Sequence, residues 1–134
     1  MISNSTEIRI SYANTDKMGY CYYGNYPTFY EIARTDLLRK YGLAYKDLEE
    51  NGIMMPVLTL NIKYIKPALY DDILSVVVSI KEIPTSRITF LYEVYNQKNE
   101  LLNTGETTLA FIDSNLRKPI KCPSIILEKL FGEI

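Results

Sequence analysis

The sequence predicts an α+β fold in which one long central helix is wrapped by a curled antiparallel sheet of about five strands. Two observations favour this class: one long stretch with helical periodicity lies near the N-terminus, and four long strand-like stretches follow it. Short connections between consecutive strands favour antiparallel pairing. Because the helix is apolar over a wide face, the sheet has to curl around it to cover that face.

The first strand is expected at 5–12 and the long helix at 25–42. Asn25 can cap the helix, Pro27 fits its first turn, and Gly42 can end it. Inside these limits apolar side chains recur at helical spacing: Tyr26, Tyr30, Ala33, Leu37 and Tyr41, with Phe29, Ile32 and Leu38 beside them. This pattern indicates a helix that is largely enclosed by the rest of the protein.

The remaining elements follow from a change of period after a short helical segment at 44–52. Strands are expected at 56–67, 72–83, 87–96 and 101–113, with a hairpin loop at 97–100 and a β-bulge at Gly105. A short amphipathic helix is expected at 124–132. Edge strands of this length expose unpaired backbone groups, so we expect a homodimer, or a homotetramer built as a dimer of dimers.

Length and composition limit the classes of function. The 134 residues are expected to form one domain over 1–134. A net charge of −1 provides no basic surface for nucleic acid, and no apolar run is long enough to span a membrane. With no signal-peptide pattern, the expected location is the cytoplasm. Cys21 and Cys122 match no metal-ligand spacing and are expected to be reduced thiols.

The chain has no histidine. Its absence removes the commonest general base and the commonest zinc ligand, together with every Ser-His and Cys-His mechanism. We therefore predict no metal site, and any acid–base chemistry has to use other side chains.

The stretch YANTDKMGYCYYGNY, residues 12–26, places one carboxylate, Asp16, in an aromatic loop just before the predicted helix. This pattern resembles the hotdog-fold acyl-CoA thioesterases, in particular the 4-hydroxybenzoyl-CoA thioesterase type and the bacterial relatives associated with the Tol-Pal system. The matching residues are Thr15, Asp16, Gly19, Tyr22, Tyr23, Asn25 and Tyr26, with weaker likeness in 29–38, 62–74 and 103–113. Many relatives have histidine where this chain has Tyr23, whereas the 4-hydroxybenzoyl-CoA type has tyrosine.

The resemblance implies the hotdog fold and hydrolysis of an acyl-CoA thioester to a free acid and CoA, with no cofactor beyond the CoA of the substrate. A thiol leaving group, with a pKa near ~8.5, needs little acid assistance. The Asp16 carboxylate then acts either as a general base or as a nucleophile, and both roles stay open. By resemblance, the backbone amide of Tyr23 polarises the carbonyl, with Gly24 beside it at the helix N-terminus. Gly19 would let the loop turn tightly.

Further substrate contacts are expected around the same loop. Tyr22, Tyr23 and Tyr26 surround the proposed site and would shape an acyl pocket, and Asn25 is a further expected substrate contact. Glu31 is first interpreted as a helix-face ion pair with Arg34, three residues later, and it can also line the cleft.

Two distant segments complete the expected site. Residues 54–56 resemble the segment that a partner subunit brings to the cleft, where Met55 would form an adaptable apolar wall. The loop at 84–87 corresponds to a more basic CoA-binding loop in the 4-hydroxybenzoyl-CoA type, and here it offers Thr85, Ser86 and Arg87. The tyrosines of the strands are expected to fill the core and interfaces: Tyr64, Tyr92 and Tyr95.

Other interpretations stay open. Without the resemblance, Asp16 is typical of an Asx-turn, and Cys21 has no histidine partner that would make it a nucleophile. An acyl-carrier-protein thioesterase and a non-catalytic acyl-binding hotdog protein are the alternative functions. A hotdog dehydratase is disfavoured because those enzymes depend on a histidine. Short, long and aromatic acyl groups all suit the expected pocket.

Overall fold

The computed structural model describes residues 2–132. Within them, one sheet of seven strands is combined with three α-helices and two short 3₁₀ turns. In chain order the elements are β1 (Ile2–Arg9), η1 (Tyr12–Asn14), η2 (Tyr23–Asn25), α1 (Tyr26–Lys40), α2 (Tyr45–Glu50), β2 (Ile53–Met54), β3 (Val57–Tyr64), β4 (Ile73–Ile80), β5 (Arg87–Tyr95), β6 (Leu101–Asp113), β7 (Lys118–Ile120) and α3 (Ser124–Phe131).

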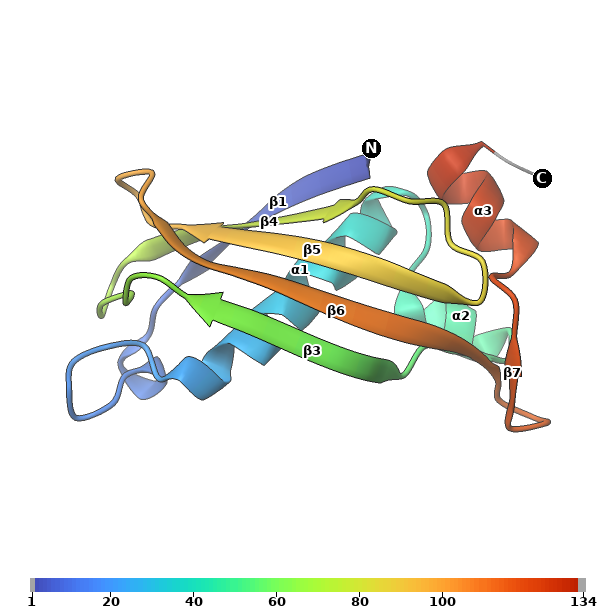
Figure 1. Cartoon of the computed structure of the whole chain (residues 1–134), viewed down its shortest axis with the longest axis horizontal. Helices are drawn as coiled ribbons and strands as arrows, with labels where there is room; N and C mark the ends of the chain where they lie inside the picture. Colours follow the sequence, from blue (N-terminus) through green and yellow to red (C-terminus); the bar gives the residue numbers. More distant parts are fainter. Residues whose placement is uncertain (1, 133–134) are drawn as a thin grey trace.

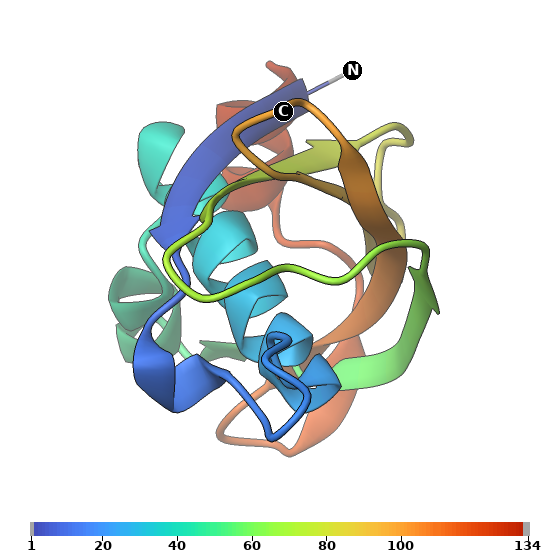
Figure 2. The same cartoon turned by 90° about the vertical axis from the view of Figure 1, so that its left-hand side faces the viewer.

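The sheet is antiparallel throughout and curls around α1, as the end-on view in Figure 2 shows. Its path runs β1-β4-β5-β6, and β3 pairs with β6 on the edge away from β5. Five strands are long, while β2 and β7 only extend the far end of β6. Figure 1 shows α1 lying along the concave face of this sheet. The predicted α+β fold with a wrapped central helix is therefore confirmed.

The helix α1 forms where its apolar pattern predicts, and the side chains of Tyr30, Ala33 and Leu37 are fully buried. Pro27 lies in the first turn as expected. The prediction that Asn25 caps the helix is wrong. Asn25 is already helical because the turn η2 precedes α1, and its side-chain amide instead donates to the carbonyl oxygen of Asn14 at 2.7 Å. The residue thus connects the preceding loop to the start of the helix.

The first strand begins earlier than predicted and ends at Arg9 rather than at residue 12. The Asn14 side chain accepts hydrogen bonds from both the backbone N–H and the hydroxyl of Ser11, each at 2.8 Å. These bonds fold Tyr12–Asn14 into a 3₁₀ turn. The turn directs the chain out of the sheet toward the N-terminal end of α1.

The β-bulge predicted at Gly105 is also wrong. Gly105 pairs in register with Ile62 of β3 and Tyr92 of β5, and the register shifts occur elsewhere in β3 and β5. A Cβ atom at position 105 would lie 2.3 Å from the ring of Tyr30. Glycine is present here because α1 packs directly against the sheet at this point.

The concave face of β3 is left uncovered by α1. Leu60 pairs with Thr107 and Tyr64 with Asn103, and opposed residues of an antiparallel pair lie on the same face. Thr107 and Asn103 are buried beneath α1, whereas Leu60 and Tyr64 are 44% and 48% exposed. We call the open strip between the helix and this strand the α1–β3 seam. Of the two places expected for Tyr64, the core or an interface, the core is wrong, since Tyr64 borders this seam.

Candidate active site

The loop between β1 and α1 is held by hydrogen bonds to itself and to the segment before β4. The N–H of Asp16 donates to the carbonyl of Tyr20 at 2.9 Å, and Gly19 closes the turn with a φ of 80°, as predicted for a glycine. The N–H of Cys21 donates to the carbonyl of Ala68 at 2.8 Å. These bonds position Asp16 in front of the N-terminal end of α1.

Only one oxygen of the Asp16 carboxylate accepts hydrogen bonds from the loop. Its Oδ1 accepts hydrogen bonds from the backbone N–H groups of Met18, at 2.9 Å, and Tyr20, at 3.4 Å. This is the Asx-turn that the residue's local sequence suggests. Among residues 2–132, no donor hydrogen-bonds to Oδ2. The loop therefore orients the carboxylate and leaves one oxygen available to a ligand or a water molecule.

Asp16 lines a cavity of about 310 Å³ whose walls include several tyrosines. Tyr23, Tyr26 and Tyr64 line it with Asp16, and the ring of Tyr64 lies 6.1 Å from that of Tyr23 and 5.9 Å from that of Tyr26. The hydroxyl of Tyr64 donates to the backbone carbonyl of Tyr23 at 3.2 Å. This bond fixes the Tyr23 carbonyl on the side of β3.

The turn η2 provides two backbone donors next to this cavity. Tyr23 and Gly24 are the first residues of η2, and a helical first turn leaves its N–H groups without intrahelical acceptors. No hydrogen bond within residues 2–132 uses either N–H. Since η2 continues directly into α1, the partial positive charge at the helix N-terminus reinforces both donors.

Burial affects titratable side chains of this cavity, among them Cys21 and Tyr26. Burial raises the pKa of the Cys21 thiol, an effect that hydrogen bonds from Asn25 and Tyr26 only partly offset. Burial also raises the pKa of Tyr26, well above its ordinary value. A thiol that keeps its proton is a poor nucleophile, so Cys21 is not suited to attack a substrate.

Comparison with known proteins identifies the family. The model of the thioesterase superfamily matches residues 18–103. The chain belongs to the thioesterase superfamily. The matched range begins just after Asp16, inside the same loop. It includes α1, β3 and every other residue that lines the cavity. The predicted resemblance to hotdog-fold acyl-CoA thioesterases is thereby confirmed, as is the hotdog fold.

Individual relatives agree with this assignment. The acyl-CoA thioester hydrolase YbgC of Escherichia coli O6:H1 is 30% identical over 120 residues, covering 90% of this chain and 90% of its own. The crystal structure of a DHNA-CoA thioesterase from Staphylococcus aureus superposes with a TM-score of 0.86 at 40% identity, covering 98% of this chain and 85% of that one. A 4-hydroxybenzoyl-CoA thioesterase variant with bound substrate shares the fold, with a TM-score of 0.87 at 22% identity and coverage of 97% and 99%.

The structure of this superfamily member brings together only part of the predicted site. Asp16, Tyr23 and Tyr26 line one cavity, and Gly19 lines an adjoining hollow with Asp16. The ring of Tyr22 packs against that of Tyr23, with ring centroids 4.8 Å apart, and lies outside the cavity lining. Gly24 adjoins the cavity with its unpaired backbone N–H. Asn25 contacts the loop through the hydrogen bond from its side-chain amide to the carbonyl of Asn14.

The other predicted residues lie elsewhere in the same chain. Glu31 pairs with Arg34 at 4.0 Å, as its spacing predicts, and the two line a separate groove with Met55. The loop that carries the proposed CoA contacts joins β4 to β5, at the end of the molecule opposite the Asp16 loop in Figure 1. Those CoA contacts are Thr85, Ser86 and Arg87. Within one chain they do not meet Asp16.

Several cavity residues were not predicted from the sequence. Beyond Tyr64, the segment that follows β3 lines the cavity with Ile65, Lys66 and Pro67. Lys66 forms an ion pair with Glu100 at the same end of the sheet. The signal available in the sequence is the position of IKP directly after a strand, where the chain leaves the sheet. The local sequence does not indicate that this segment packs beside the loop that carries Asp16.

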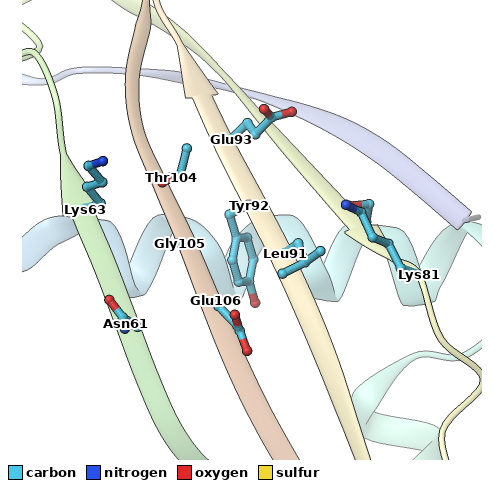
Figure 3. A pocket seen from close by; sticks show the side chains of 10 residues that line it. Asn61, Lys63, Lys81, Leu91, Tyr92, Glu93, Thr104, Gly105 and Glu106 are labelled. Carbon is cyan, nitrogen blue, oxygen red and sulfur yellow. The ribbon is translucent and has the colours of Figure 1, made fainter.

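A second hollow, of about 480 Å³, lies on the convex face of the sheet and is drawn in Figure 3. Lys63 of β3, Glu93 of β5 and Glu106 of β6 line it together with Lys81, which directly follows β4. None of these four forms an ion pair within residues 2–132, and the hollow is remote from Asp16 because the sheet separates it from α1. It offers no carboxylate held next to unpaired backbone donors.

Two absences complete the description. Among residues 2–132, no three His, Cys, Asp or Glu side chains gather in a way that would bind a metal ion. Across the same residues, none of the helices has the length and apolar character that crossing a membrane requires.

Proposed function

We propose that this protein is an acyl-CoA thioesterase that hydrolyses its substrate to a free acid and CoA, with Asp16 as the reacting carboxylate. One observation carries the proposal: Asp16 keeps a free oxygen in an aromatic cavity that adjoins two unpaired backbone amides. Membership of the thioesterase superfamily and the names of the relatives support this reaction class.

The carboxylate of Asp16 starts the reaction by one of two routes. Its Oδ2 either removes a proton from a water molecule, whose oxygen then attacks the thioester carbonyl, or attacks the carbonyl itself to give a mixed anhydride that water then cleaves. In both routes the bond between the carbonyl carbon and sulfur breaks, and CoA leaves as a thiolate, a good leaving group because a thiol has a pKa near ~8.5. The thiolate then takes up the proton that the water has lost. The loop amides of Met18 and Tyr20 hold Oδ1 throughout.

The amides of Tyr23 and Gly24 stabilise the oxyanion. Donors of this kind are oriented before the reaction begins, and losing one typically lowers the rate by about 10²–10³. Tyr64 assists indirectly, because its hydroxyl holds the Tyr23 carbonyl and so orients the adjoining peptide plane.

We further propose that a second copy of the chain completes the site. Thr85, Ser86 and Arg87 lie at the opposite end of the molecule from Asp16, so one CoA can reach both only across two copies. The outer edge of β3 pairs with no strand within residues 2–132, and the exposed Leu58 would be covered by such a copy. Analytical ultracentrifugation should find a dimer or larger oligomer that Leu58→Lys weakens, and a native monomer would contradict the proposal.

Asp16→Asn is the sharpest test of the mechanism. An asparagine Oδ1 can still accept from Met18 and Tyr20, so the loop keeps its conformation while the charged oxygen is lost. We expect kcat to fall by about 10²–10⁴. Thiol release from a panel of short, long and aromatic acyl-CoAs measures it, and Asp47→Asn, an exposed carboxylate on α2, serves as the matched control.

Each outcome of this test is informative. Turnover of the Asp16→Asn variant at the native rate would refute the role of the carboxylate. No thiol release by the native protein with any acyl-CoA would instead favour an acyl-carrier-protein substrate or a non-catalytic binding protein. Turnover in ¹⁸O-labelled water followed by mass spectrometry of the Asp16 peptide separates the two routes, since only the nucleophilic route places the label in the carboxylate.

A further inference from the structure

Arg34 on α1 is a buried cation without a close anion. Only 6% of its surface is exposed. Its Nε donates to the hydroxyl of Tyr45 at 3.2 Å and its Nη1 to the hydroxyl of Tyr92 at 3.5 Å. Among residues 2–132, Glu31 is the one carboxylate within 4.0 Å, at 4.0 Å from Nη2, and its side chain is 65% exposed. A buried charge is costly unless it is closely paired, so this guanidinium is under-neutralised.

The guanidinium nevertheless keeps its charge. Burial works against the charged form of Arg34, but the neighbouring Tyr45 and Tyr92 outweigh it and leave the pKa raised. An arginine does not lose its proton inside proteins. The missing neutralisation therefore has to come from another negative group rather than from deprotonation.

The free end of Arg34 faces an open groove. Two adjoining cavities, of about 320 Å³ and about 270 Å³, share Glu31, Arg34 and Val57 among their lining residues. The smaller one extends along the α1–β3 seam to Pro27 and Leu60. Tyr64, which lines the Asp16 cavity, lies on the same face of β3 as Leu60, four residues further along the strand. The two cavities share no lining residue, but Leu60 and Tyr64 place both of them beside this one face of β3.

We propose that Arg34 binds a carboxylate at the distal end of the acyl group, so that the substrates are CoA thioesters of dicarboxylic acids. This inference rests on the proposed function, because it assumes that the thioester lies at Asp16 and that the acyl chain follows the seam. Arginine suits the role, since its planar fork forms two parallel hydrogen bonds with a carboxylate. The apolar Val57 and Leu60 would contact the methylene chain.

The separation of Tyr23 and Arg34 along the helix determines the length of acyl chain that can reach both. Arg34 follows Tyr23 by eleven residues, which corresponds to about 16 Å along the helix axis. Long helical side chains lean back toward the N-terminus, which brings the guanidinium several ångströms closer to Tyr23. A chain of medium length, such as the suberoyl group, is therefore a better match than a succinyl group.

Glu31 acts as a competitor for the same guanidinium. Its contact with Nη2 is long and solvated, so a closely bound carboxylate of the substrate can displace it. Replacing Glu31 by glutamine removes a negative charge from the mouth of the groove without changing its size. The affinity for a distal carboxylate should then rise.

The test compares suberoyl-CoA with octanoyl-CoA, which differ in the distal carboxylate. The kcat/KM for suberoyl-CoA divided by the kcat/KM for octanoyl-CoA should fall by about ten-fold or more in Arg34→Met, as expected for a lost charge-assisted hydrogen bond. The ratio should rise several-fold in Glu31→Gln. Arg39→Met, which removes an exposed arginine of the same helix that pairs with Asp36, should leave the ratio unchanged.

A binding measurement separates this inference from the proposed function. Calorimetric titration with free suberate and free octanoate needs no turnover, so it reports on Arg34 even if no acyl-CoA is cleaved. Suberate should bind the native protein, more tightly to Glu31→Gln and weakly to Arg34→Met. An unchanged substrate ratio in Arg34→Met, or equal binding of suberate by native protein and Glu31→Gln, would overturn the inference. Dissociation of the oligomer in Arg34→Met with an unchanged ratio would do so too, because Arg34 would then face a carboxylate of a second copy.

Discussion

The contact between Gly105 of β6 and Tyr30 of α1 allows a quantitative prediction for Gly105→Ala. A Cβ at position 105 would lie 2.3 Å from Cε2, 2.4 Å from Oη and 2.6 Å from Cζ of Tyr30, far inside van der Waals contact. The ring has little room to move. It is fully buried and stacked on Tyr92 with centroids 4.1 Å apart, and its hydroxyl donates to Asn103 at 2.6 Å.

Two penalties follow from moving that ring. Overpacking a dense core destabilises by about 1–3 kcal/mol, and losing the Tyr30–Asn103 bond leaves buried polar atoms unpaired at a further cost of about 1–3 kcal/mol. We therefore expect Gly105→Ala to lower the free energy of unfolding by about 2–6 kcal/mol, against a total that is typically about 5–15 kcal/mol. The change would make a large difference to the amount of folded protein.

Urea denaturation followed by far-UV circular dichroism measures this loss. Tyr30→Leu, alone and together with Gly105→Ala, completes a double-mutant cycle that isolates the clash. Gly105→Ala should be much less destabilising when the ring is absent, and Thr104→Ala, in the same strand, provides a control. The reasoning is refuted if Gly105→Ala matches the native protein in stability, or if its effect is the same in both backgrounds.

Three further predictions concern single side chains. Tyr30→Phe should reduce the free energy of unfolding by about 1–3 kcal/mol, measured by urea denaturation, because Asn103 Nδ2 is already without a partner among residues 2–132 and the Oδ1 would lose its donor as well. Tyr64→Phe should lower kcat of thiol release by up to about ten-fold with little change in KM, since it frees the Tyr23 carbonyl; an unchanged kcat would contradict the role given to that peptide. Burial raises the pKa of the Cys122 thiol from 9.0 to about 11, so the native state holds this proton more tightly than the unfolded state. The stabilisation is complete below pH 9 and is lost as the pH rises from 9 to 11, and Cys122→Ala should flatten that part of the curve of unfolding free energy against pH.

The sequence was sufficient where a structural feature depends on a local repeat. The apolar positions of α1 recur at the helical period, and the glycine at 42 ends the helix region with a φ of 80°. Each long strand lies within a few residues of its expected place because alternation and turn residues are local signals. The motif around Asp16 was likewise contiguous, so family membership could be predicted from it, and it also supplied the hypothesis that Asp16 is the reacting carboxylate.

The tertiary structure alone decided which distant groups meet. Asn25 contacts Asn14 rather than capping α1, Gly105 admits Tyr30 rather than forming a bulge, and Tyr64 borders the active-site cavity rather than the core. Each of these depends on how far the sheet curls around α1, which is the outcome of packing over the whole chain. The same holds for Arg34, whose spacing predicts an ordinary surface ion pair. Because the period of a segment specifies only which face a side chain occupies, the neighbour on that face is determined by the fold.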